Sequence, residues 1–270
     1  MRAKSFVLLI ALTAFTLGAV NPAAARDLKM ATTTSTDNSG LLKALLPKYE
    51  AKCGCKVHVV AVGTGAALKL GENGDADVVL VHARKAEDAF VAKGFGVNRR
   101  DVMYNDFVLV GPKNDPAQLR GMKDVIAAMK KIKVSGAGFV SRGDDSGTNK
   151  TELGYWKTAG IDPKGASYFA IGQGMGQTLT VAGEKAAYTL TDRATYATYK
   201  DRTGLEIVVE GDAKMYNPYG VIAVNPKRFS GVNYAGAMDF IEWITSPAAQ
   251  QEIAAFKPTG AQLFFPNARK

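Results

Sequence analysis

The sequence predicts an α/β protein with mostly parallel sheets, divided into two lobes that two strands connect. Short β-prone segments alternate with segments whose apolar residues recur at helical spacing. The run Ala76 to Val81, apolar apart from Asp77, is typical of a parallel strand covered on both faces, and Phe107 to Val110 is typical of another buried strand. The alternation restarts after Asn114, which indicates a second lobe. The composition, 47% hydrophobic and 22% charged, is ordinary for a globular protein and argues against a disordered, coiled-coil or multi-pass membrane chain.

The first lobe begins with three strands that alternate with helices. The helix over 40–53 is the clearest element, because Leu41, Leu42, Leu45 and Tyr49 recur at the spacing of one helix face. The expected elements are, in order, a strand at 28–31, a helix at 40–53, a strand at 56–62, a helix at 66–71, a strand at 76–81, a helix at 84–93 and a strand at 107–110.

The second lobe and the return to the first follow the same reasoning. Gly111-Pro112 closes the strand at 107–110, and Tyr216 to Gly220 introduces another strong strand. We expect helices at 116–131, 146–159 and 174–183, strands at 138–141, 205–209 and 221–224, and terminal helices at 234–245 and 247–256. The predicted lobe 1 therefore comprises residues 26–112 and 216–270, and lobe 2 residues 113–215. Two strands would cross at a hinge, with a ligand cleft between the lobes.

Residues 1–25 have the pattern of an export signal peptide. Arg2 and Lys4 precede an uncharged run from Phe6 to Val20, and a small-residue cleavage pattern ends at Ala25. The run is short for a transmembrane anchor. We therefore expect cleavage after about Ala25 and a mature periplasmic chain that is not inserted in a membrane. Cleavage removes Arg2 and Lys4, so the formal charge falls from +9 to +7, with 32 basic and 25 acidic residues left in the mature chain.

The two histidines and two cysteines are too few for a dedicated zinc site. Cys53-Gly54-Cys55 would meet an oxidising compartment after export. Two interpretations stay open: a disulfide that closes a very small ring, or a thiol pair with no structural role. The spacing differs from the Cys-x-x-Cys of redox enzymes, which makes a redox role the less favoured hypothesis.

Three strand-to-helix loops share small hydroxyl and glycine residues. They are Thr32 to Ser35, Gly63 to Ala66 and Ser141 to Thr148. Free N–H groups and the positive end of the dipole make helix N-termini favourable for anions, and hydroxyls add neutral donors. Each loop alone is better explained by ordinary helix capping. Three such loops, one of them carrying Arg142, favour a shared oxyanion site, whereas an ion pair of Arg142 with Asp144 or Asp145 is the plain alternative.

Other ligand and enzyme classes lack their motifs. Leu68 stands where a dinucleotide fingerprint needs a third glycine, and Gly147 is not followed by the Lys-Ser or Lys-Thr of a P-loop. His58 falls inside a strand, and His82 ends one without a nucleophile elbow nearby. Nucleic acid is disfavoured because the cations are spread along helices. The rival class is a hydrolase of anionic substrates with Ser146 or Asp145 as nucleophile.

At these loops the sequence resembles the periplasmic tungstate-binding proteins of Tup-type ABC transporters. The resemblance covers nearly all of the mature chain. Its motifs are Thr32 to Thr36 with Ser39 to Leu42, Val62 to Leu68, Asp77 to His82, Tyr104 to Phe107, Phe139 to Thr148 and Gln262 to Pro266. The first and fourth of these are the specific ones. Cys53-Gly54-Cys55 is not part of the pattern.

The resemblance implies a monomeric type II periplasmic binding protein that is not an enzyme and has no cofactor or metal site. It would capture tungstate, with molybdate as an alternative ligand, between its lobes and deliver it to a permease with its ATPase. The oxyanion shell that the motif positions imply consists of Thr33, Thr34, Ser35, Thr64, Gly65, Ala66, Arg142, Ser146, Gly147 and Thr148. Phosphate is the alternative, because Arg142 to Thr148 also fits the phosphate-binding pattern. Phosphate still carries a proton at neutral pH, so Asp144 or Asp145 in direct contact with the anion would favour phosphate.

Overall fold

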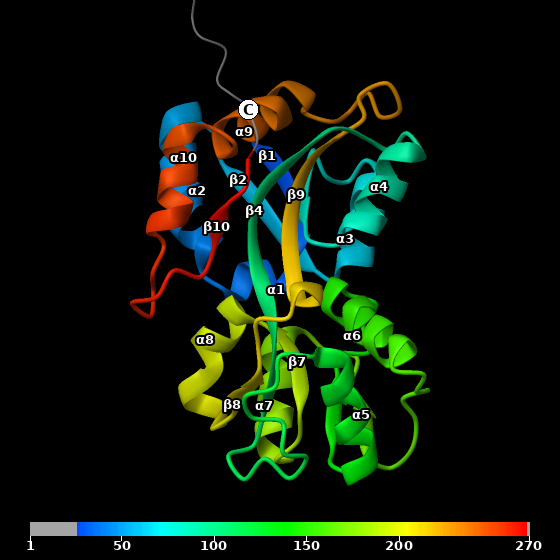
Figure 1. Cartoon of the computed structure of the whole chain (residues 1–270). Coiled ribbons are helices and arrows are strands. Elements are labelled where there is room, and N and C mark those ends of the chain that lie inside the picture. The colour runs from blue at the N-terminus through cyan, green and yellow to red at the C-terminus, as the bar shows by residue number, and fades with distance from the viewer. Residues whose placement is uncertain (1–25, 269–270) are drawn as a thin grey trace, which may run out of the picture.

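The computed structural model describes residues 26–268, so the predicted signal peptide lies outside the described residues. Two halves lie one above the other, joined by long strands (Figure 1). The chain builds most of the first half from β1 (Leu28–Thr33), α1 (Thr34–Asn38), α2 (Leu41–Cys53), β2 (Val57–Val62), α3 (Thr64–Asn73), β3 (Val78–Val81), α4 (Arg84–Ala92) and β4 (Gly96–Gly111).

The second half follows from β4 onward. Its elements are α5 (Val125–Ser135), β5 (Phe139–Ser141), α6 (Gly147–Thr158), β6 (Tyr168–Ala170), α7 (Met175–Glu184), β7 (Thr189–Asp192), α8 (Arg193–Thr203), β8 (Glu206–Val209) and the 3-10 turn η1 (Ala213–Met215). The chain then returns to the first half through β9 (Tyr216–Val224), α9 (Tyr234–Ile244), α10 (Pro247–Ala255) and β10 (Phe265–Pro266).

The main sheet has the strand order β10-β4-β9-β3-β1-β2, and β7 and β8 also pair with β4. β1 is parallel to β2 and β3, and β5 is parallel to β6, as the α/β class predicts. Antiparallel pairing enters through β4 and β9, which pair from Gly96–Val224 to Asp106–Tyr216. A chain that leaves one half along β4 and returns along β9 must reverse its direction, which explains this pairing. These two long strands are the crossings of the two-lobed fold (Figure 1).

Four clusters of buried apolar side chains form the core. Two of them draw on residues 28–103 and 219–264, together with Ala194. The other two draw only on residues 107–215. β4 therefore contributes to the core of both halves. Its residues up to Met103 pack in the core of the first half, and its residues from Phe107 onward pack in the core of the second. The lobe ranges 26–112 with 216–270, and 113–215, remain a prediction.

Several elements differ from their predicted bounds. β4 begins at Gly96, eleven residues before the predicted strand, because its polar half contains register irregularities beside β9 that hide the alternation. The helix predicted from Pro116 begins at Val125, because Asp124 caps it by accepting the N–H groups of Ile126 and Ala127. The segment before that cap is made of turns, with Asp115 and Gln118 at positive φ.

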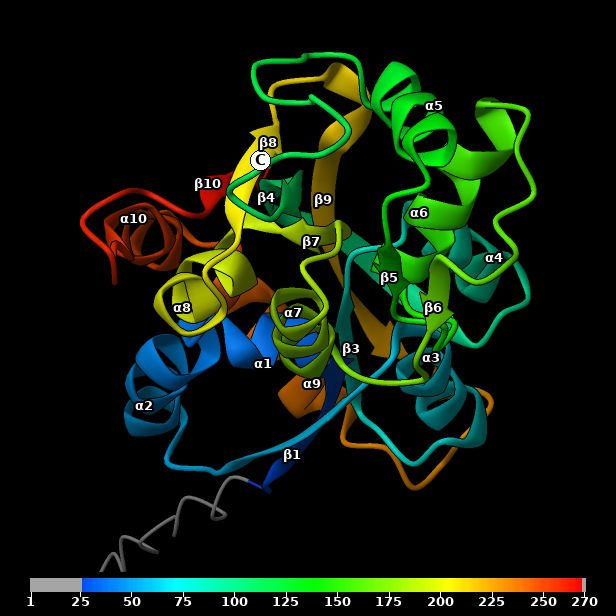
Figure 2. The same ribbon diagram turned by 90° about the horizontal axis from the view of Figure 1, so that it is seen from below.

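Six described elements were not predicted: α1, β6, β7, α8, η1 and β10. α8 buries only Ala194, Thr195 and Tyr196, so it has little of the apolar periodicity by which helices are recognised. α1 is a helix of five residues inside the hydroxyl-rich loop. Seen from below, α7 and α8 lie against α1, so helices of the second half meet the first helix of the other half (Figure 2).

Candidate functional site

The three predicted loops meet where the two halves touch. Arg142 donates from Nη2 to Thr34 Oγ1 over 3.1 Å, which joins the β5–α6 loop to the start of α1. The N–H of Gly147 donates to Thr64 Oγ1 over 2.9 Å, which joins the same loop to the start of α3. Three helix N-termini from distant parts of the chain are thereby brought together, and each carries N–H groups without intrahelical partners.

Arg142 is the charged group of this junction, and its side chain is only 2% exposed. Its Nη2 also donates to Asp144 Oδ2 over 2.6 Å, so the predicted alternative of an ion pair is present. Its Nε and Nη1, however, are buried without a hydrogen-bond partner among residues 26–268. Burial lowers the pKa of Arg142, while Asp144 opposes that shift. Since arginine keeps its proton, buried and unused donors on a charged group favour a bound anion.

Three hydroxyl oxygens are already acceptors. Thr34 Oγ1 accepts from Arg142, Thr64 Oγ1 accepts from Gly147, and Ser146 Oγ accepts the N–H of Asn149 as the cap of α6. An oxygen fixed in this way still has its own hydrogen to donate. Thr148 Oγ1 is buried with no partner among the described residues. The loops therefore present hydroxyl donors beside Arg142.

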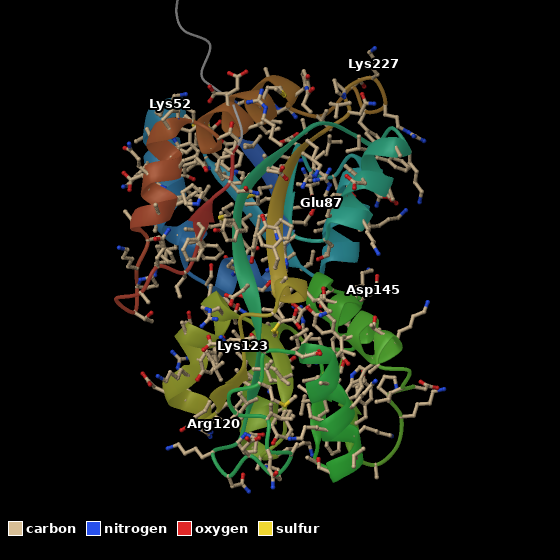
Figure 3. The ribbon with its side chains drawn as sticks, viewed as in Figure 1. Lys52, Glu87, Arg120, Lys123, Asp145 and Lys227 are labelled. Carbon is tan, nitrogen blue, oxygen red and sulfur yellow. A yellow bond between two sulfur atoms is a disulfide. The ribbon has the colours of Figure 1, made fainter. Side chains whose placement is uncertain are left out.

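The glycines of the loops permit close approach between the halves. A Cβ on Gly65 would lie 2.7 Å from Asp145 Oδ2, and one on Gly147 would lie 3.1 Å from Thr64 Oγ1. Larger residues would therefore push the helix starts apart. Figure 3 labels Asp145 at this junction, where its carboxylate pairs with Lys150. Ala66 has an exposed side chain, so only its backbone could serve a ligand.

The β1–α1 loop holds a second group of hydroxyls. Thr33 Oγ1 lies 2.7 Å from Thr36 Oγ1 and 3.1 Å from Ser35 Oγ. His82 Nε2, at the end of β3, lies 3.1 Å from both Thr33 Oγ1 and Ser35 Oγ. Its Nδ1 lies 2.9 Å from Asn217 Oδ1 on β9. Burial, with a smaller contribution from the charge of Arg142, lowers the pKa of His82 to about 4, so the ring is neutral near pH 7.

Sequence reasoning noted His82 as able to face the cleft and gave it no role, and it missed Asn217 and the start of α8. Thr195 Oγ1 donates to the carbonyl of Ser35, and Asp192 caps α8 by accepting the N–H of Thr195. The segment from Thr189 to Arg193 has the same strand, hydroxyl and helix order as the three recognised loops, and that order was the available signal.

A groove of about 550 Å³ leads to this junction from the surface. His82, Gly147 and Asn217 line its inner part, and Lys85 and Lys150 line its rim. Within residues 26–268, no group of three or more histidine, cysteine or acidic residues is arranged to hold a metal ion. Over the same residues, none of the helices combines the length and apolarity needed to cross a bilayer.

Comparisons with known proteins identify the family to which the sequence is similar. A family model described as a PBP superfamily domain matches residues 19–248. The tungstate-binding protein TupA of Peptoclostridium acidaminophilum is 51% identical over 245 residues, 89% of this chain and 86% of that protein. TupA of Campylobacter jejuni is 46% identical over 240 residues, covering 87% and 89%.

Solved structures give the same result. The tungstate ABC transporter structure from Geobacter sulfurreducens superposes with a TM-score of 0.79 at 57% identity, covering 86% of this chain and 98% of that one. The tungstate-binding protein TupA from Desulfovibrio alaskensis has a TM-score of 0.75 at 49% identity, covering 91% and 100%.

Proposed function

The chain belongs to the PBP superfamily and, within it, to the family of tungstate-binding proteins, and from that premise we propose that it captures tungstate at the junction of its two halves. It would act in the periplasm as a monomer and deliver the anion to an ABC transporter permease with its ATPase. The observation that carries the proposal is the pair of buried, unpartnered donors on Arg142, Nε and Nη1. Tungstate is a fully ionised dianion at neutral pH and needs donors only.

The proposed shell is built from the three loops. Arg142 supplies the charge, Thr34, Thr64, Ser146 and Thr148 supply hydroxyl hydrogens, and the starts of α1, α3 and α6 supply backbone N–H groups, including those of Ser35, Gly65, Ala66 and Gly147. Because the loops come from both halves, separation of the halves would open the shell and closure would complete it.

Phosphate fits this arrangement less well. Both oxygens of Asp144 are engaged, Oδ2 by Arg142 and Oδ1 by the N–H of Ser146 at 3.2 Å. The carboxylate of Asp145 is 75% exposed and pairs with Lys150. Asp144 is therefore placed to orient Arg142, and Asp145 lies toward solvent, an arrangement that favours a fully ionised anion over hydrogen phosphate.

A hydrolase is the second class to weigh. Ser35, His82 and Asn217 lie in hydrogen-bonded sequence, as in a serine triad. The pKa of His82, about 4, makes it a poor base at neutral pH. Ser146, the nucleophile suggested by sequence, is the cap of α6 and accepts the N–H of Asn149. These contacts suit binding without turnover.

Calorimetric titration of the chain from Arg26 onward with tungstate, molybdate, sulfate and phosphate tests the proposal. We expect one tungstate per chain and much weaker binding of phosphate and sulfate. The affinity for molybdate, relative to that for tungstate, measures how far the site selects between these two similar anions by size. A parallel assay with an aryl phosphate ester should show no turnover. Preferential phosphate binding, or steady ester hydrolysis, would contradict the proposal.

A further inference from the structure

His82 is a buried titratable group to which the proposed tungstate shell gives no role. Its side chain lies at the meeting point of four elements. The ring stacks on Tyr219 of β9, with centroids 4.7 Å apart and planes at 23°. It lies 6.3 Å from the ring of Phe107 on β4, and a Cβ on Gly147, at the start of α6, would lie 3.5 Å from its Cε1. His82 therefore lies against both crossing strands, β4 and β9, and against the start of α6 in the opposite half.

The contacts of Asn217 determine which nitrogen of His82 carries the proton. Asn217 Nδ2 donates to Asn105 Oδ1 over 2.7 Å, which links β9 to β4 and places the amide oxygen of Asn217 on the side of His82. The amide oxygen of Asn217 therefore faces His82 Nδ1, and an oxygen can only accept. It follows that Nδ1 bears the hydrogen and that Nε2 of the neutral ring is an acceptor.

The hydrogens of the three nearby hydroxyls can then be assigned. Thr33 Oγ1 accepts the N–H of Thr36 and lies 2.7 Å from Thr36 Oγ1, so its two lone pairs are used when Thr36 donates. The hydrogen of Thr33 then goes to Nε2, whose single lone pair it fills. In this arrangement the hydroxyl of Ser35, which lies 3.1 Å from both Thr33 Oγ1 and His82 Nε2, keeps its hydrogen for an oxyanion.

We propose that His82 is a positioning residue of the anion site, which accepts the Thr33 hydroxyl at Nε2, frees the Ser35 hydroxyl for the oxyanion and ties both to Asn217 on the crossing strand β9. This inference rests on the proposed function. Asn217 on β9 thereby holds the imidazole ring, and the ring in turn holds the hydroxyls of the β1–α1 loop in one orientation.

Nitrogen NMR of the ¹⁵N-labelled chain from Arg26 onward tests the assignment directly, because the protein has only two histidines. His58, which is exposed and pairs with Asp27, serves as the internal reference. At neutral pH we expect His82 to show a protonated Nδ1 and an unprotonated Nε2. Addition of sodium tungstate should shift the Nε2 signal of His82 while Nδ1 stays protonated, and the His58 signals should not move. A merely structural histidine would not respond in this way.

Two variants separate coupling from folding. His82→Gln removes the ring link and should weaken tungstate binding about ten-fold, while the matched variant His58→Gln should bind as the wild type does. Thr33→Val should shift Nε2 of His82 before any tungstate is added, because Nε2 loses its donor. Circular dichroism confirms that each variant is folded.

The outcomes distinguish this inference from the function on which it rests. A hydrogen on Nε2 at neutral pH, or an Nε2 signal unmoved at saturating tungstate in a wild-type protein that binds, would overturn the role of His82 and leave tungstate binding intact. A wild-type protein that binds no tungstate would overturn the proposed function, and with it the coupling. If His82→Gln loses its fold, the NMR measurement on the wild type still decides.

Discussion

Thr64 and Gly147 are 83 residues apart in the sequence, and their backbone and side chain meet in a single hydrogen bond of 2.9 Å. The bond joins the first residue of α3 to the first residue of α6, so each helix N-terminus lies beside the other. Thr64 is completely buried, and its oxygen accepts while its hydrogen stays available. The hydroxyl of Thr64 therefore links the two halves by accepting the N–H of Gly147, and its hydrogen can be donated to the proposed anion.

Replacing Thr64 by valine keeps the shape of the side chain and removes its hydroxyl group, which is both the acceptor and the donor. The N–H of Gly147 would lose its acceptor, and the proposed shell would lose one donor. We expect Thr64→Val to weaken tungstate binding by about 1.5 kcal/mol, roughly ten-fold, as measured by calorimetry. Thr158→Val is the matched control, because Thr158 is an exposed residue of α6 whose hydroxyl bonds only within its own helix. Equal affinity of the Thr64 and Thr158 variants would refute the role of Thr64.

The same pair shows how much the sequence could predict. Thr64 was identified because it follows a β-rich segment and a glycine, which is a local pattern. The contact with Gly147 depends on how the two halves close, and no local pattern encodes it. His82 shows the same difference: its place at the end of a strand was visible, whereas its partners Ser35 and Asn217 lie 47 and 135 residues away.

Secondary structure was predictable where apolar spacing was regular, as in α2 and β3. It failed where polar residues carry the element. The helix α8 is held by the cap of Asp192 and by ion pairs such as that of Arg193 with Asp106, so few apolar residues mark it. The turns between Gly111 and Val125 contain apolar residues at near-helical spacing, and the real helix begins only where Asp124 caps it.

Arg142 gives the second prediction. Arg142→Gln removes the buried charge and both unpartnered donors, so tungstate binding should weaken by about 2 kcal/mol or more, roughly thirty-fold. Arg142→Lys should give an intermediate loss, because an ammonium group keeps the charge but lacks the planar fork that reaches Thr34, Asp144 and a ligand together. Calorimetry measures both variants.

The control for that series is another arginine of the same half. Arg120 is exposed, pairs with Glu206 and lies far from the junction in Figure 3. Arg120→Gln removes the same charge from the protein and should leave the affinity unchanged at moderate ionic strength. If Arg120→Gln weakens binding as much as Arg142→Gln, general electrostatic attraction accounts for the loss, and the local assignment of Arg142 fails.

The disulfide between Cys53 and Cys55 supplies the third prediction and answers the question left open by the sequence. It closes a very short loop, so chain entropy assigns it only about 1.5 kcal/mol of stability. It lies before β2, whose far end carries the Gly63-Thr64 loop, and six strand residues span about 20 Å. The double variant Cys53→Ala, Cys55→Ala should therefore lose about that stability in urea unfolding and keep its tungstate affinity. Lost affinity in a folded double variant would show that the cysteines communicate with the site.

The last prediction uses the pKa of His82, which burial lowers from 6.5 to about 4. A histidine that is neutral in the fold takes up a proton on unfolding once the pH is below its unfolded pKa. The unfolded state then binds more protons than the folded state, so the free energy of unfolding falls as the pH falls from about 6.5 toward 4. His82 alone should remove about 2 kcal/mol between pH 7.5 and pH 5.

Other buried groups titrate too, so a difference measurement is needed. Burial raises the pKa of Glu152 and of Asp192, which acts in the opposite direction as the pH falls. His82→Gln removes only the histidine. The stability advantage of the wild type over His82→Gln, from urea unfolding, should therefore shrink by about 2 kcal/mol from pH 7.5 to pH 5. The variant His58→Gln, which changes the other histidine of the protein, is measured alongside as the matched substitution. A pH-independent gap between wild type and His82→Gln would mean that His82 is not held neutral, and the acceptor role of its Nε2 would fall with it.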